Sequence, residues 1–147
     1  MKQQGGRDGR AMPDRRTRGE SPLQTETKTF EPLRDIRPHA LREGITARAV
    51  EGERMTMAVV DLEPDVAMPE HHHENEQLGF VIAGSMTMWI GDEKSELRPG
   101  DTYAIPSDIP HHVVVGSDGC TVVDVFAPVR EDWKKLDRLE PARPNWP

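Results

Sequence analysis

Histidines gathered in two short segments are the feature of this chain with the clearest chemical potential. Five of the six histidines lie at 71–73 and at 111–112, about forty residues further on. Neutral imidazole is the commonest protein ligand for transition metals, because it binds them without adding charge. If the first segment is a β-strand that continues to Gln77, then His71, His73 and Gln77 share one face, since alternate residues of a strand do so.

His111 is the candidate for a fourth ligand, supplied by another strand. Three imidazoles and an amide would leave room at the metal for water or substrate, which is the layout of a catalytic site. The plainer interpretation of His71, His73 and His111 is a polar surface patch. For Gln77 the alternative is a hydrogen bond to a ligand in place of metal coordination.

The remaining histidines are expected to lie outside the site. His72 and His112 each neighbour a candidate ligand, so strand alternation points them to the opposite face. His39 stands alone next to Pro38 and is expected to be a solvated loop residue.

Composition limits the class of protein. The chain has 147 residues, enough for one domain with a core, and no apolar run approaches the ~18 residues that span a bilayer. No apolar stretch at the N-terminus indicates a secretory signal. Cys120 is the single cysteine, which excludes an internal disulfide framework and favours a cytoplasmic location. The net charge of −7 disfavours nucleic acid as a partner.

Three regions are expected from the distribution of charge and proline. Residues 1–28 form a basic tail: residues 1–22 carry a net charge of +3 and almost no apolar side chains. A disordered extension is the expected state, with a nucleic-acid-binding arm or a misassigned start codon as alternatives. Residues 29–139 would form the folded domain. Residues 140–147 contain three prolines and are expected to be an irregular C-terminal tail.

Short runs of β-branched and apolar residues between turn signals predict an all-β domain. An edge strand or packed arm is expected within 29–43, a loop between Pro64 and Pro69, and one short helix at 131–136. Turn signals every eight to twelve residues favour a sandwich or barrel. The expected strands are 45–50, 54–62, 76–82, 85–90, 95–98, 102–105, 112–116 and 121–126.

Two stretches resemble the two sequence motifs of the cupin superfamily and occur in the same order. Residues 69–84 read PEHHHENEQLGFVIAG, which is similar to the first motif, G-x5-H-x-H-x3,4-E-x6-G. Residues 98–111 read RPGDTYAIPSDIPH, which is similar to the second, G-x5-P-x-G-x2-H-x3-N. The resemblance covers about residues 45–127. It implies a double-stranded β-helix, the jelly-roll barrel of cupins, with one divalent transition metal.

Four positions depart from the motifs. Asp65 and Asp108 replace glycines, and Val115 replaces an asparagine. Gln77 stands at the usual glutamate ligand. An amide leaves the full charge of a divalent ion on the centre, which makes it a stronger Lewis acid and a poorer stabiliser of a higher oxidation state. Polarisation of a substrate oxygen is therefore favoured over activation of O2.

The end of the β region resembles a narrower group, the cupins related to the pectin-degradation protein KdgF. Residues 124–133 read DVFAPVREDW, which is similar to the D-x-F-S-P-P-R-E-D-Y segment of that group. The resemblance implies ring opening of unsaturated monouronates to linear keto sugars. Asp124 would act as general acid or base, Arg130 would bind the substrate carboxylate, and Phe126 would wall the pocket. The alternative for Asp124 is a buried structural acid or a helix cap. For Arg130 it is a surface ion pair with Glu131 or Asp132, and for Phe126 it is a plain core residue.

The leading hypothesis is therefore a non-redox, metal-dependent enzyme acting on a small carboxylated sugar. An Fe-dependent dioxygenase and a non-catalytic small-molecule-binding protein are the rivals. The sequence leaves the metal open among Ni, Zn, Fe, Mn and Co. The resemblance also implies a homodimer, for which the 29–43 arm is the candidate contact.

Overall fold

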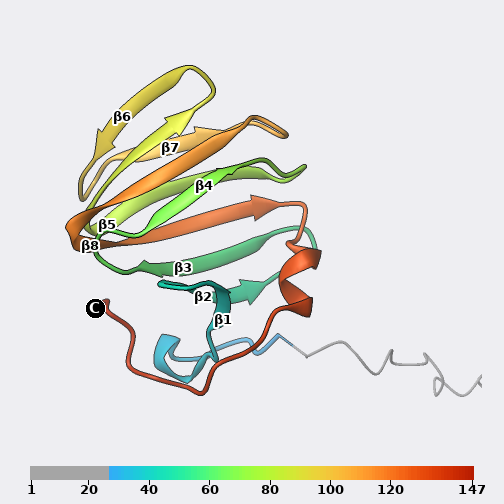
Figure 1. The fold of residues 1–147 in the computed structure, drawn as a ribbon. Helices are drawn as coiled ribbons and strands as arrows, with labels where there is room; N and C mark the ends of the chain where they lie inside the picture. The colour runs from blue at the N-terminus through green and yellow to red at the C-terminus, as the bar shows by residue number, and fades with distance from the viewer. Residues whose placement is uncertain (1–26) are drawn as a thin grey trace, which may run out of the picture.

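The computed structural model describes residues 27–147 (Figure 1). All but the last two residues of the expected basic tail therefore lie outside the described residues. The expected all-β jelly roll is confirmed, with two short 3-10 helices, η1 (Leu33–Asp35) and η2 (Glu131–Lys135). No helix in the described part is long and apolar enough to cross a membrane. The strands are β1 (His39–Arg42), β2 (Ile45–Glu51), β3 (Thr56–Leu62), β4 (Ala67–His71), β5 (Glu76–Ile90), β6 (Glu93–Leu97), β7 (Thr102–Ile105) and β8 (His111–Ala127).

Strands β5 and β8 are long and belong to two layers at once. The first half of β5 pairs with the second half of β8, and these halves also pair with β7 and β3 respectively. The second half of β5 pairs with the first half of β8, flanked by β6 and β4. All these pairings are antiparallel. The two long strands therefore hold both layers of the barrel together.

Glycines allow the two long strands to bend between the layers. The expectation was two strands on either side of Ala83-Gly84, whereas β5 runs through them with irregular register on both sides. Gly84 has a φ of +73°, and a Cβ there would overlap the backbone of Gly119 on β8. In the same way, β8 continues through Ser117-Asp118-Gly119, which the sequence predicted to be a turn between strands.

The prediction of a loop from Pro64 to Pro69 is wrong in its second half. Residues Ala67–His71 form β4, which pairs with β8. The register shifts between Met68 and His71, so Pro69, which lacks an N–H donor, lies where the pairing is irregular. Proline is tolerated at such positions of outer strands.

The core lies between the layers and is lined by alternate residues of the strands. Ile45, Val81 and Ile105 are each 1% exposed. Burying an aliphatic side chain of this size contributes about 1.5–3 kcal/mol. The alternation extends to polar residues, because Gln77 and Asp124 are buried on the same inner face as Phe126.

The C-terminal segment 140–147 contains no helix or strand, yet it is attached to the sheet. Arg48 and Asp61 form a buried ion pair (Nη1–Oδ2 3.0 Å) on the outer side of β2 and β3. The Nη2 group of Arg48 donates to the carbonyl of Ala142 at 2.9 Å. Figure 1 shows this segment passing beside β1 and β2.

His39 is buried, so the prediction of a solvated loop residue is wrong. It begins β1 and is 4% exposed, with its ring 6.1 Å from that of Trp133. Strand β1 pairs with β2 on one edge, and residues 137–139 hydrogen-bond to Pro38 and Ala40 on the other. The sequence near Pro38 gave no sign of the distant segment that covers this side chain.

His39 makes the stability of the protein depend on pH. Burial, together with the charge of Arg138, lowers the pKa of His39 to about 4 from 6.5. The unfolded chain therefore takes up a proton that the folded chain resists, so stability falls as the pH drops from about 6.5 toward 4. We expect His39→Phe, which retains an aromatic ring beside Trp133, to lose less unfolding free energy across this range.

Urea denaturation of the metal-free protein at pH 7 and at steps down to pH 4 measures this difference. Circular dichroism at pH 7 serves as the control for the fold of the variant. Equal slopes of stability against pH in the two proteins would contradict the prediction.

Candidate metal centre

Three histidines from two segments of the chain meet between the two layers. His71 ends β4, His73 lies in the loop that follows, and His111 begins β8, where it pairs with His71. One ring nitrogen from each lies within 4.8 Å of the others. The three histidines grouped by the sequence as candidate ligands do lie together, but the strand argument for them is wrong, because 71–77 is not one strand. Gln77 belongs to β5, which starts after a turn.

Backbone carbonyls fix which nitrogen of each imidazole faces the centre. The Nδ1 atoms of His71, His73 and His111 lie 2.8, 2.9 and 2.8 Å from the carbonyl oxygens of Pro69, Asn75 and Ile109. An imidazole nitrogen this close to a carbonyl oxygen must carry the hydrogen, because the oxygen only accepts. In each neutral ring the lone pair is then on Nε2. A carbonyl partner of this kind is typical of metal-binding histidines.

The Nε2 atom of His111 is buried and has no hydrogen-bond partner among the described residues. Burial lowers the pKa of His111 to about 4 and also lowers the pKa of His73, to which the charge of Arg130 contributes. These rings are therefore neutral near pH 7. An unpaired buried nitrogen is costly unless a cation or proton binds it.

Gln77 supplies a fourth donor atom. Its Oε1 lies 3.2 Å from Nε2 of His73. Because Nδ1 of His73 carries the hydrogen, two lone pairs face each other across this distance. A cation that accepts both would resolve the contact. The four residues predicted as metal ligands therefore fit a divalent transition metal in their chemistry and arrangement.

The neighbouring histidines lie outside the cluster, as the sequence predicted. His72 is exposed, with its Nδ1 3.7 Å from a carboxylate oxygen of Asp108. His112 stacks on Trp89 with ring centroids 4.3 Å apart.

Phe126 and Asp124 lie on the layer that faces the histidines. The ring of Phe126 is 5.8 Å from that of His73. Asp124 is buried and accepts a hydrogen bond from the hydroxyl of Tyr103. Burial raises the pKa of Asp124 to about 6, against the opposing effect of hydrogen bonds from Tyr103 and Gln77 and of the charge of Arg130.

Arg130 lies at the end of the barrel nearest Phe126. Its guanidinium is 4.7 Å from the ring centroid of Phe126 and 4.6 Å from that of Trp133. Asp132 accepts from Nε at 3.0 Å and from Nη2 at 2.8 Å, which leaves Nη1 for another acceptor. The predicted alternative, pairing with Asp132, does occur, but the arginine side chain is largely buried and the carboxylate is 64% exposed.

Sequence reasoning assigned no role to two residues that hold the site together. Asn75 donates to the carbonyl of Pro128 at 2.6 Å, which ties the loop carrying His73 to the segment before Arg130. Tyr103 holds Asp124. Neither residue type marks a site by itself. Asn75 is buried although it lies in a run of charged and polar residues, and this burial is visible only in the structure.

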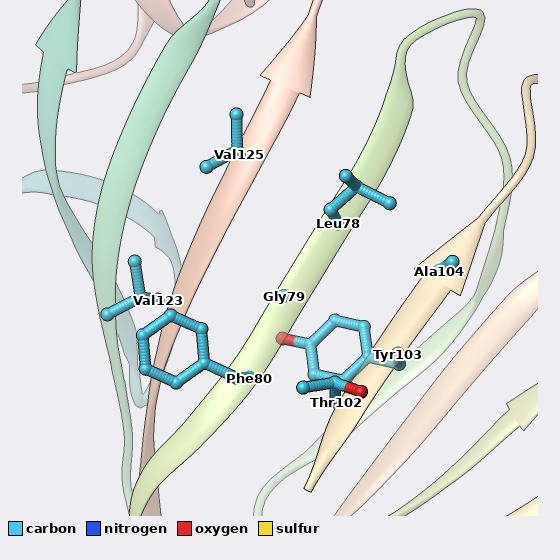
Figure 2. A pocket seen from close by; sticks show the side chains of 8 residues that line it. All are labelled: Leu78, Gly79, Phe80, Thr102, Tyr103, Ala104, Val123 and Val125. Carbon is cyan, nitrogen blue, oxygen red and sulfur yellow. The ribbon is translucent and has the colours of Figure 1, made fainter. Parts of the chain in front are cut away.

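A separate hollow of about 440 Å³ lies on the outer side of the barrel wall (Figure 2). It contains no histidine and no charged side chain. Its lining comes from β5, β7 and β8: Leu78, Gly79, Phe80, Thr102, Tyr103, Ala104, Val123 and Val125.

Known proteins share sequence and fold with this chain. The cupin domain family model matches residues 58–126. The pectin degradation protein KdgF of Dickeya dadantii is 34% identical over 68 residues, which are 46% of this chain and 62% of that protein. The match thus spans less than two thirds of the relative's length.

Solved structures share the fold. KdgF from a Halomonas species superposes with a TM-score of 0.66 and 26% identity, over 72% of this chain and 98% of the other. An RmlC-like cupin from Shewanella frigidimarina superposes with a TM-score of 0.67 and 19% identity, over 72% and 96% of the two chains. The family match, the relative and the shared barrel agree that residues 58–126 form a cupin domain.

Proposed function

We propose that this chain is a metal-dependent, non-redox enzyme that opens unsaturated monouronates to linear keto sugars. The observation that carries the proposal is the convergence of three imidazole Nε2 atoms and the amide oxygen of Gln77 beside the guanidinium of Arg130. Similarity to two proteins named KdgF, one of them described as a pectin degradation protein, supports the substrate class.

His71, His73, His111 and Gln77 would hold one divalent ion. The bound ion would act as a Lewis acid toward substrate oxygens. With neutral ligands only, the centre retains its full positive charge, which favours binding of an anionic or polar substrate. Ni, Zn, Fe, Mn and Co remain the candidates, because imidazole accepts all of them.

Arg130 would bind the substrate carboxylate. Stacking between Phe126 and Trp133 removes water from its guanidinium, which strengthens a bond to an anion. A substrate carboxylate would use Nη1 or displace the exposed carboxylate of Asp132, whose own pKa is lowered by the hydrogen bond to Arg130. Phe126 would form the wall between this anchor and the metal centre.

Ring opening is an isomerisation that needs proton transfer and no oxidant. The hydroxyl on the anomeric carbon loses its proton, and the bond from that carbon to the ring oxygen breaks. The ring oxygen then becomes a ketone as the enol carbon takes up a proton. Asp124 would serve as the acid or base, since burial raises its pKa to about 6, close to neutral pH.

Removal of a ligand tests the metal centre. We expect His73→Ala to weaken binding of Zn²⁺ or Ni²⁺ at least about tenfold, because one of four donors is lost. His72→Ala is the matched control. The ring of His72 points away from the cluster, so its removal should leave the affinity for the metal unchanged. Isothermal titration calorimetry on the metal-free proteins measures both. Equal loss in the two variants would reject the assignment of His73.

Replacement of Arg130 tests the substrate anchor. We expect Arg130→Lys to raise KM for an unsaturated monouronate at least about tenfold, since an ammonium cannot form the same planar, paired hydrogen bonds. The exposed Arg98, which pairs with Glu96, provides the control Arg98→Lys. A kinetic assay of uronate ring opening measures the change.

Three results would overturn the proposed activity. Wild-type protein loaded with each candidate metal could show no turnover of unsaturated uronates. Consumption of O2 with a substrate under Fe(II) would instead support the dioxygenase. Tight binding of a small ligand without turnover would support the binding protein.

We also propose that two copies pair through the outer wall that contains the hollow of Figure 2. The arm proposed from the sequence is less suitable, because both edges of β1 are already hydrogen-bonded within the chain. Leu78 and Phe80 are 50% and 42% exposed, and the lining of the hollow is uncharged. Copies that each carry a net charge of −7 repel least where they meet on such a surface.

Light scattering tests this contact. We expect wild-type protein to have the mass of a dimer and Phe80→Glu to have that of a monomer, since the new carboxylate would be buried without a partner. Phe30, 90% exposed within the 29–43 arm, gives the control Phe30→Glu, which should remain dimeric. Dissociation by Phe30→Glu alone would favour the arm, and a monomeric wild type would reject dimerisation.

A further inference from the structure

Tyr103, Gly79 and Asp124 form one row across three neighbouring strands. Gly79 on β5 pairs with Tyr103 on β7 and with Asp124 on β8. Side chains of residues in such a row lie on the same face of the sheet. The hydroxyl of Tyr103 therefore reaches across Gly79 to the carboxyl of Asp124. Figure 2 shows the tyrosine ring extending from β7 toward β5 at Gly79.

The row depends on the absence of a side chain at position 79. A Cβ at Gly79 would overlap both a carboxyl oxygen of Asp124 and the ring of Tyr103. Glycine in the middle of a strand weakens the strand, and it often marks a place where other groups approach closely. Here the approaching groups are a phenol and a carboxyl.

Gln77 lies on the same face of β5, one step closer to the histidines. It pairs with Phe126, which places Asp124 diagonally opposite on β8, within reach of a long side chain. The side chain of Gln77 lowers the pKa of Asp124 against the effect of burial, as expected for an amide that lies next to the carboxyl group. Since a carboxylate only accepts, the amide NH2 of Gln77 must face Asp124, and its Oε1 then faces Nε2 of His73.

We propose that Tyr103 is a positioning residue that, through Asp124, fixes the amide of Gln77 with its oxygen toward the metal centre. This inference rests on the proposed metal site. Rotation of the amide by half a turn would place its NH2 against the cation and its oxygen against the carboxylate. Both ends of the Gln77 side chain therefore disfavour the reversed orientation.

Tyr103 has a defined part in this arrangement. Burial raises its pKa well above the usual value, so the phenol retains its hydrogen and remains a donor. By donating to one carboxyl oxygen of Asp124, it fixes the plane of the carboxyl group. A carboxylate that accepts from the NH2 of Gln77 also increases the negative charge on the amide oxygen, which makes it a better metal ligand.

Binding of Co²⁺ to the metal-free protein tests the inference without substrate. We expect Tyr103→Phe, which removes the hydroxyl and retains the ring, to weaken Co²⁺ binding about tenfold. We also expect a change in the visible absorption of bound Co²⁺, which reports the ligands directly. Thr102→Val is the matched control: it removes a hydroxyl from the adjacent residue, whose side chain lines the outer hollow.

A double-mutant cycle then separates positioning from a general loss of structure. If Tyr103 acts through Gln77, adding Tyr103→Phe to Gln77→Ala should not weaken Co²⁺ binding further. An equal effect in both backgrounds would overturn the inference, as would wild-type affinity and spectrum in Tyr103→Phe. Thermal unfolding of each metal-free variant identifies a folding defect. Failure of the wild type to bind Co²⁺, Zn²⁺ or Ni²⁺ would instead reject the proposed metal-dependent function, and this inference with it.

Discussion

The pairing of β5 with β8 is the constraint on which the other features depend. Each long strand contributes one half to each layer, so the layers cannot separate without breaking both strands' hydrogen bonds. The same pairing supplies the site: β8 begins with His111 and carries Asp124 and Phe126 near its end, while β5 begins near Gln77. The histidines enter from one layer and the amide, carboxyl and phenyl groups from the other.

The site combines unpaired donor atoms with little freedom to move. The cost of burying Nε2 of His111 without a partner is offset by burial of the surrounding apolar residues, which keeps the ring in place. A site that is already arranged before it binds an ion loses little conformational entropy on binding. Arg130 is held in the same way, by two aromatic rings and a carboxylate.

Sequence patterns predicted which histidines lie together better than they predicted where these histidines lie in the fold. His71 and His73 were chosen because they were assumed to alternate along one strand, whereas a strand end and a loop hold them. Strand existence was predictable from β-branched runs, but the continuity of β5 through Gly84 was not, because glycine marks turns and bends alike. The burial of His39 depends on residues a hundred positions away, and no local pattern contains that information. The roles of Tyr103 and Gly79 can be inferred only once it is known which residues pair across the strands.

The attachment of each imidazole to a backbone carbonyl has a consequence for how such a site can diversify. Pro69, Asn75 and Ile109 contribute main-chain oxygens, which remain whatever side chains occupy those positions. The orientation of the three imidazole rings therefore does not depend on which side chains occupy these positions. Position 77 is different, since its side chain would provide the fourth donor, and exchange of glutamine for glutamate would alter the charge of the proposed centre by one unit. A single substitution at position 77 would therefore change the charge presented to a bound ion, while the carbonyls that orient the three histidines stay in place.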